Sequence, residues 1–257
     1  MFIVIVGDPG TGKTVSAATF PKPMMFMDWD DGAVSLKYAR NKEGQLIIPP
    51  EELKQISIID FKRTHFSPVQ AQTILKGKFS LPHTVDAPKM MDTFNNSLNS
   101  IREGNYKTLV IDSLTTMFRV WKEAVCYHMN QPLLQIQDYN TLDVMLYGQF
   151  IPALRALPVD YVILIDHIAM EVDKVTGLLV EFPVGPSRNT GRQLPKEFDE
   201  VWRQMVIGDE KYVWKTKRGN ELLQTKTRHH IPDGIEANFN NIKDFLILVD
   251  SEPQTAV

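Results

Sequence analysis

The chain opens with an apolar run, Phe2–Val6 (FIVIV), followed at once by Gly7–Thr14 (GDPGTGKT). The first segment has the length and composition of a buried strand. The second matches the phosphate-binding loop, in which glycines let the backbone turn tightly so that its N–H groups point at phosphates. In this pattern Lys13 reaches the β- and γ-phosphate oxygens, and the Thr14 hydroxyl binds Mg²⁺. The pair predicts a nucleotide-binding protein; the alternative is a glycine-rich turn without a ligand.

The residues expected to contact the nucleotide follow from this loop. They are Gly7, Asp8, Pro9, Gly10, Thr11, Gly12, Lys13, Thr14 and Val15.

Length and composition indicate one α/β domain. The chain has 257 residues, of which 43% are hydrophobic, enough for a substantial core. We expect a single domain over 1–250, with an insertion at about 41–88 and a tail at 251–257. The single cysteine, Cys126, excludes an internal disulfide framework. No apolar stretch is long enough for a membrane span or a signal peptide, so we expect a cytoplasmic protein without membrane contact. The net charge of −3 means that any nucleic-acid binding must be local.

Hydrophobic patterning predicts the rest of the fold. Apolar runs place further strands at 24–28, 56–59, 108–112 and 161–165, and helical periodicity places helices at 13–20, 89–103, 114–129 and 140–157. Strands that alternate with helices predict a mainly parallel sheet flanked by helices. Short alternating segments at 201–207, 211–216 and 222–227 then predict antiparallel strands on the C-terminal side.

Asp112 ends the apolar run 108–112. A carboxylate at such a strand end can support the metal ion opposite Thr14, which is the Walker B position. The alternative is a helix cap for the segment that starts at Ser113. Because Ser113 rather than Glu follows Asp112, the group that would activate a water molecule must come from elsewhere or be absent.

Together these features resemble the RecA-like ATPase core. The resemblance rests on the phosphate loop, the strand end Phe26-Met27-Asp28-Trp29-Asp30, the Asp112 strand and the strand end Ile165-Asp166-His167. It implies a RecA-like P-loop ATPase fold. It also implies ATP as the nucleotide and Mg²⁺ as the metal, with Thr14 and Asp112 at the metal.

The same resemblance assigns the water-positioning carboxylate to Asp30. The family usually has Glu there, and Asp is one methylene shorter, so hydrolysis could be slow. The alternative for Asp28, Asp30 and Asp31 is a solvated acidic turn. His167 corresponds to the family's polar residue that senses the γ-phosphate, with a strand-end histidine hydrogen-bonded at the surface as the alternative.

Two basic segments are candidates for contacts beyond the nucleotide. The stretch 168–194 corresponds to the DNA-contacting loop region of RecA-like proteins, and its Lys174, Arg188 and Arg192 are candidate phosphate contacts. An ordinary hairpin with solvated charges is the alternative.

Lys226 and Arg228 end an apparent strand within a net basic stretch, on the same strand face. In RecA-like assemblies such cations act on the neighbouring subunit's γ-phosphate; the alternative is an edge strand protected by charge.

The group that the chain resembles most is the phage-type, core-only RecA-like ATPases, which include single-strand annealing and recombination proteins. The phrases 17–23 (AATFPKP) and 198–201 (FDEV) carry that likeness. It implies an Mg-ATP-dependent ATPase that acts on single-stranded DNA in phage recombination, annealing or replication. It also implies a homo-oligomer, ring or filament, a phage replication or recombination protein as a partner, and the cytoplasm of an infected bacterium as the location.

Two alternatives stay open. One is a nucleotide-switched module that binds a protein partner and hydrolyses ATP poorly, with no stimulation by DNA. The other is a P-loop kinase, which would need an arginine-rich lid; the 41–88 insertion offers only Arg63.

Overall fold

The computed structural model describes residues 1–61, 87–131, 133–173, 177–208, 211–217, 223 and 225–247. The strands are β1 (Phe2–Val6), β2 (Met24–Asp28), β3 (Ile56–Asp60), β4 (Thr108–Asp112), β5 (Tyr161–Asp166), β6 (Ile168–Val172), β7 (Leu179–Pro183), β8 (Glu200–Ile207), β9 (Lys211–Lys215) and β10 (Ile235–Glu236). The α-helices are α1 (Lys13–Ala17), α2 (Pro50–Leu53), α4 (Ala87–Glu103), α5 (Leu114–His128), α6 (Asp138–Asp143), α7 (Ile151–Arg155), α8 (Arg188–Gln193) and α9 (Lys243–Ile247). Short 3₁₀ helices cover Gly32–Lys37, Leu194–Glu197 and Phe239–Asn241, and a π-helical segment covers Val144–Phe150.

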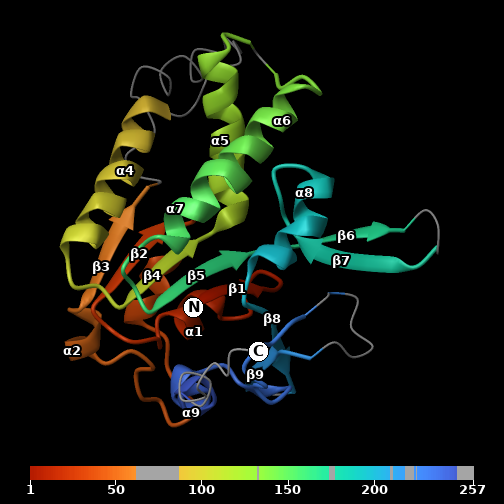
Figure 1. The fold of residues 1–257 in the computed structure, drawn as a ribbon. Coiled ribbons are helices and arrows are strands. Elements are labelled where there is room, and N and C mark those ends of the chain that lie inside the picture. Colours follow the sequence, from red (N-terminus) through yellow and green to blue (C-terminus); the bar gives the residue numbers. More distant parts are fainter. Residues whose placement is uncertain are drawn as a thin grey trace, which may run out of the picture.

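One mainly parallel sheet runs through the molecule in the order β10-β9-β8-β1-β5-β4-β2-β3 (Figure 1). From β8 to β3 all neighbouring strands are parallel, and β9 and β10 continue the sheet in antiparallel fashion. The predicted fold class is therefore confirmed: a mainly parallel sheet flanked by helices, with antiparallel strands on the C-terminal side. Strands β6 and β7 form a separate two-stranded hairpin that extends from the body (Figure 1).

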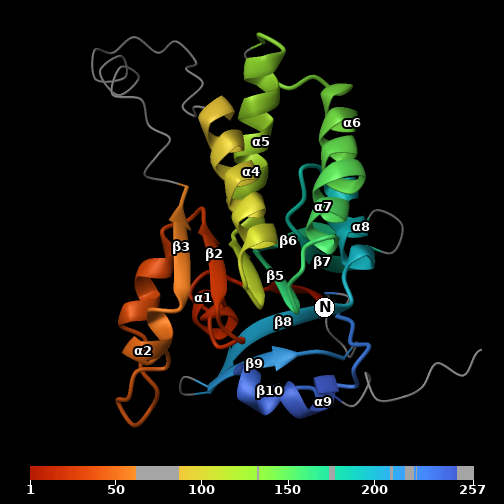
Figure 2. The ribbon, with the colours of Figure 1, turned by 60° about the vertical axis from the view of Figure 1, so that its left-hand side comes forward.

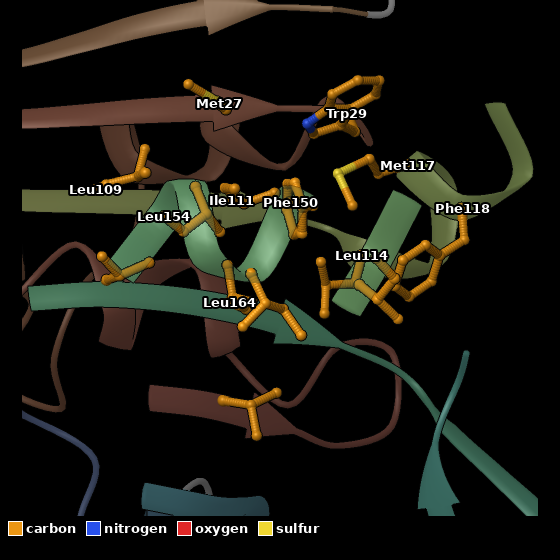
Figure 3. Close-up of a cluster of buried hydrophobic side chains, with 14 of the residues drawn as sticks. Met27, Trp29, Leu109, Ile111, Leu114, Met117, Phe118, Phe150, Leu154 and Leu164 are labelled. Atoms are coloured by element: carbon orange, nitrogen blue, oxygen red, sulfur yellow. The ribbon is translucent and has the colours of Figure 1, made fainter. Parts of the chain in front are cut away.

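The central strands are buried on both faces, which is why they read as continuous apolar runs. In β1, Val4 and Val6 belong to one core cluster, whereas Ile3 and Ile5 belong to the other. The first cluster lies under α4, α5 and α7, and the second lies under α1 and α9 (Figures 1 and 2). Figure 3 shows part of the first cluster, where apolar side chains of α5 and α7 meet those of β2, β4 and β5. This two-sided packing fixes the strand ends relative to one another.

Strand register brings the polar strand ends to one edge of the sheet. Asp112 lies opposite Asp28 on β2, and Val6, the last residue before the phosphate loop, lies opposite Asp166 on β5. Because parallel strands end on the same side, these carboxylates and the phosphate loop share one edge. We call it the carboxyl edge.

Three sequence-based expectations need correction. The segment expected to be one helix at 140–157 is instead α6, the π-helical segment and α7 in succession. A regular α-helix is interrupted there because Gly148 is a poor helix former and Pro152 cannot donate the backbone hydrogen bond that a regular turn requires. The segment 222–227 is not a strand in its described residues: Leu223 makes an isolated bridge to β7 and Lys226 to β8, so the chain crosses between two strands instead of following one. The helix expected at 13–20 ends at Ala17.

The described part of the expected insertion joins the sheet. Strand β3 pairs with β2 along its whole length and forms one end of the sheet order. Residues 62–86, the rest of that region, and the expected tail at 251–257 lie outside the described residues, and the domain limits stay a prediction. Within the described residues, no helix is both long and apolar enough to cross a membrane.

Candidate functional site

The phosphate loop packs tightly against β8, the strand that pairs with β1. A Cβ atom at Gly7 would lie 2.6 Å from the backbone oxygen of Gln204 on β8, so only glycine fits there. Gly10 and Gly12 both have φ of +79°, in the left-handed region that favours glycine. Thr11 closes the turn, since its hydroxyl donates to the Asp8 carbonyl at 2.8 Å. The glycines of the motif are therefore needed for the loop's shape, as the sequence pattern predicts.

Lys13 is buried beneath this loop. Its Nζ donates to the carbonyl oxygens of Gly7 and Asp8, at 2.8 Å each. Burial lowers the pKa of the Lys13 ammonium, and nearby carboxylates, Asp112 foremost, oppose that shift. An ammonium held inside the curve of the loop suits the β- and γ-phosphate oxygens of a nucleotide.

Thr14 and Asp112 meet at the position expected for a metal ion. The Thr14 Oγ1 donates to Asp112 Oδ2 at 2.6 Å. Burial raises the Asp112 pKa to about 7, since Asp30 and Asp28 add to the effect of desolvation and outweigh the Thr14 hydrogen bond. One hydroxyl and one carboxylate fit Mg²⁺, which usually takes its remaining ligands from phosphates and water. The residue that caps helix α5 is Ser113 and not Asp112, because the Ser113 Oγ accepts from the Thr116 N–H at 3.4 Å.

Asp28 and Asp30 have different roles although both follow the same strand. Asp28 accepts hydrogen bonds from the backbone N–H groups of Asp30, Gly32 and Ala33 at 3.0–3.1 Å. It therefore shapes the turn, and burial raises its pKa. Asp31, with φ of 61°, completes that turn. The acidic-turn alternative thus explains Asp28 but not the side chain of Asp30.

The Asp30 carboxylate points at the start of α5 and at His167. Its Oδ2 accepts from Ser113 Oγ at 2.5 Å, and its Oδ1 accepts from Thr116 Oγ1. Burial would raise the Asp30 pKa, but the polar contacts with His167, Ser113 and Thr116 outweigh it and lower the pKa to about 2. The group is a fixed anion at neutral pH, as a residue that orients water requires.

His167 lies beside this anion. Its Nε2 is 3.9 Å from Asp30 Oδ2, an ion-pair distance that exceeds a hydrogen bond. The polar contact with Asp30 raises the His167 pKa against the opposing effect of burial. The structure therefore brings Lys13, Asp112, Asp30 and His167 to the same edge.

Asp166 is a site residue that the sequence analysis quoted but did not assign. It is fully buried, and its Oδ1 accepts from Thr115 Oγ1 at 2.5 Å and from the His167 N–H at 2.9 Å. Burial raises its pKa to about 7. Among the described residues, the buried polar atoms without a hydrogen-bond partner include Asp166 Oδ2, His167 Nδ1 and Trp29 Nε1. All three lie at or directly after the ends of β2 and β5, at the carboxyl edge.

Gln204 and Tyr212 are contacts of the phosphate loop that sequence reasoning missed. The Gln204 side chain donates to the Thr11 carbonyl at 2.6 Å and accepts from Ser16 Oγ at 2.6 Å and Trp214 Nε1 at 3.0 Å. The Tyr212 ring packs against Gly12 so closely that a Cβ atom at Gly12 would lie 3.1 Å from it. Both residues come from β8 and β9, far along the chain, and no local pattern marks them.

Lys226 and Arg228 lie beside the amino ends of β1 and β8, whereas the phosphate loop follows the carboxyl end of β1. Lys226 bridges to Val201 on β8, and its Nζ donates to the Phe198 carbonyl at 2.5 Å. Arg228 pairs with Asp199 at 2.9 Å. Their expected role in a neighbouring subunit stays a prediction.

Arg188 and Arg192 lie on α8 and face carboxylates of β6 and the residue that follows it. Arg188 lies 3.4 Å from Glu171, and Arg192 lies 3.5 Å from Glu171 and 3.9 Å from Asp173. Lys174 lies outside the described residues, as does Arg63 of the kinase alternative. A role for these cations at nucleic acid stays a prediction.

Comparison with known proteins places this site in a family. A family model described as AAA domain matches residues 1–230. The chain belongs to the AAA domain family. With its phosphate loop, this AAA domain is a P-loop ATPase. No curated protein matches it.

Several solved structures are similar to the AAA domain at low sequence identity. An ATPase from the type III secretion system of pathogenic bacteria is 13% identical over 79% of this chain and 52% of that chain, with a TM-score of 0.44. A KaiC-like protein from the archaeon Pyrococcus horikoshii is 17% identical over 88% and 83%, with a TM-score of 0.42. The RadB recombinase is 16% identical over 91% and 84%, with a TM-score of 0.39. The AAA domain spans about half the length of the secretion ATPase.

Proposed function

We propose that this AAA domain hydrolyses Mg-ATP and acts on single-stranded DNA in phage recombination, annealing or replication. The observation that carries the hydrolysis is the presence of two carboxylates at one edge. Asp112 is bonded to Thr14 at the expected metal position, and Asp30 is held as an anion by His167, Ser113 and Thr116. The DNA role rests on the resemblance to RecA-like recombination ATPases. The protein would act in the cytoplasm of an infected bacterium.

Each site residue has a part in this reaction. Lys13 binds the β- and γ-phosphate oxygens, and Thr14 and Asp112 would hold Mg²⁺, which would supply neutralising charge at the phosphates. Asp30 accepts a hydrogen bond from the attacking water and orients it toward the γ-phosphorus, in line with the bond to the departing ADP. His167, next to Asp30, donates a hydrogen bond to the γ-phosphate and moves when that phosphate leaves.

An oligomer, ring or filament, completes this proposal. The side chains of Lys226 and Arg228 are bonded to Phe198 and Asp199, which directly precede β8, and not to the phosphate loop of their own chain, so they would stabilise the γ-phosphate of a neighbour. Lys174, Arg188 and Arg192 would contact DNA phosphates once the ion pairs of Arg188 and Arg192 open.

A second candidate is a nucleotide-switched module that binds a protein partner of phage replication. The β6–β7 hairpin favours it, because Met170 and Val172 are more than half exposed on this projecting element. Exposed apolar side chains that gather on one element are typical of protein contacts.

Steady-state ATP hydrolysis with and without single-stranded DNA separates the two candidates. Lys13→Ala serves as the blank, and Lys37→Ala, an exposed lysine outside the site, as the matched control. A rate that rises several-fold with DNA supports the proposed function. Hydrolysis that DNA does not change would overturn the DNA role and favour the switched module.

A further inference from the structure

A groove beside the nucleotide site carries cations that the proposed reaction does not use. Two adjoining hollows, about 500 Å³ and 280 Å³, share Lys122 and Gly185 in their walls. They run between α5 on one side and the segment 184–188, which links β7 to α8, on the other; the positions of α5 and α8 can be followed in Figure 1. We call this feature the α5 groove.

One face of helix α5 lines the groove. Leu114, Met117, Phe118 and Trp121 are buried in the core, part of which Figure 3 shows. Thr115, Arg119 and Lys122 follow one another at spacings of four and three residues, which places them together on another face. All three contribute to the groove wall. The helix therefore presents two cations to the groove because its apolar residues turn toward the core.

These cations are available for an anion. Among the described residues, neither Arg119 nor Lys122 makes a hydrogen bond or ion pair with a carboxylate, whereas Arg188 on the far wall is paired with Glu171. Lys122 Nζ lies 5.9 Å from the centre of the Tyr139 ring, which also lines the groove. Partial burial lowers the Lys122 pKa, so a neighbouring anion would stabilise its charged form.

The inner end of the groove touches the nucleotide site. Thr115 and Thr116 line it, and their hydroxyls donate to Asp166 and Asp30 respectively. Arg119 is one helical turn beyond Thr115 on the same face. A ligand bound by Arg119 and Lys122 would therefore lie one to two turns of α5 from the carboxylates at the carboxyl edge.

We infer that the α5 groove binds the phosphodiester backbone of single-stranded nucleic acid, with Arg119 and Lys122 at the phosphates and Tyr139 against a base. This inference rests on the proposed function and identifies where its DNA would bind. Cations that follow a groove, interleaved with an aromatic ring, are the features by which proteins hold single strands without reading sequence. An acidic peptide would use the cations but has no aromatic base for Tyr139.

The test is binding of a fluorescent single-stranded oligonucleotide, measured by anisotropy with Mg²⁺ and a non-hydrolysable ATP analogue at several salt concentrations. The variant is Arg119→Ala/Lys122→Ala. Its matched control is Lys37→Ala/Arg102→Ala, which removes the same charge from exposed positions elsewhere. Thermal melting and DNA-free ATP hydrolysis check that each variant is folded, because none of the four side chains belongs to the nucleotide site.

We expect the groove variant to bind the oligonucleotide about tenfold more weakly or worse, and the slope of log K against log[salt] to decrease in magnitude by about one to two. The control variant should bind nearly as well as the wild type. A Tyr139→Ala variant should also bind more weakly, but with an unchanged salt dependence. Equal weakening in groove and control variants would overturn the groove assignment, because it would report only overall charge.

Two further outcomes separate this inference from the proposed function. If the wild type and the groove variant bind the oligonucleotide equally well, the groove assignment fails while the DNA role stands. If the wild type binds polyglutamate but no oligonucleotide, both the groove's ligand and the DNA role are wrong.

Discussion

The two ends of the central sheet both carry charged side chains, but they hold them differently. At the carboxyl edge, Asp112 and Asp166 are buried with pKa values raised to about 7, and Asp166 Oδ2 has no hydrogen-bond partner among the residues that the structure describes. At the amino end, Arg228 is exposed and paired with Asp199, and Lys226 is bonded to a backbone carbonyl. Buried carboxyl groups with shifted pKa values gather at functional sites, whereas exposed and paired charges contribute little beyond the surface they lie on. Chemistry within one chain therefore belongs to the carboxyl edge.

Lys13→Ala, at the carboxyl edge, should have the largest effect of the variants on ATP hydrolysis. Removing the ammonium under the phosphate loop leaves the β- and γ-phosphates without their principal cation, so we expect ATP hydrolysis to fall by about 100-fold or more. Steady-state hydrolysis measures it, with Lys37→Ala as the control. A variant that kept more than a tenth of the wild-type rate would show that the loop does not hold the reacting phosphates.

Gln204→Leu should have the next largest effect. The change leaves Ser16, Trp214 and the Thr11 carbonyl without their shared partner, at about 1–3 kcal/mol for buried groups of this kind. We expect ATP affinity to fall by about tenfold, together with a lower melting temperature. Gln137→Leu, at an exposed position, is the matched control and should change neither. Unchanged ATP affinity in Gln204→Leu would mean that β8 does not support the loop.

The charge state of His167 gives a smaller but specific effect. Its pKa is raised because the Asp30 carboxylate favours the protonated ring. Asp30→Asn removes that charge, and the remaining burial favours the neutral ring, so the His167 pKa should fall. An NMR titration of the ring protons, assigned with His167→Gln, measures the shift. A pKa that stayed the same or rose would show that the two side chains are not in contact.

Arg228→Ala should have the smallest effect within a single chain. Its ion pair with Asp199 is exposed, and such pairs contribute about 0–1 kcal/mol to stability. We expect unchanged ATP affinity and nearly unchanged unfolding by denaturant. Mixed with wild type, the variant should lower hydrolysis by more than its share, because it would supply a defective neighbour. A strictly proportional decrease in the mixture would contradict the shared site.

The sequence predicts the buried strands and the residues directly after them, but not the contacts between residues that are far apart along the chain. Buried strands such as 2–6 and 108–112 were located to the residue, because parallel strands covered on both faces are continuous apolar runs. Residues directly after those strands, such as Asp112, could be placed together because the strands end on one side. Gln204 could not, because it lies 193 residues from Thr11, the loop residue it contacts.

The remaining differences have local physical causes. Segment 222–227 has the composition of a strand, but it bridges to two different strands, and a sequence pattern carries no information about which partner a residue meets. The hydroxyls of Ser113, Thr115 and Thr116 look like an ordinary helix start in the sequence. Only the register of β2, β4 and β5 shows that they hold Asp30 and Asp166.

The most direct test of this account is the rate of ATP hydrolysis by Asp30→Asn, measured beside the affinity for a non-hydrolysable ATP analogue. If Asp30 orients the attacking water, kcat should fall by about 100-fold or more while affinity for the analogue stays within about twofold. Asp30→Glu, which restores the carboxylate on a longer side chain, should keep measurable turnover. Wild-type turnover in Asp30→Asn would contradict the account.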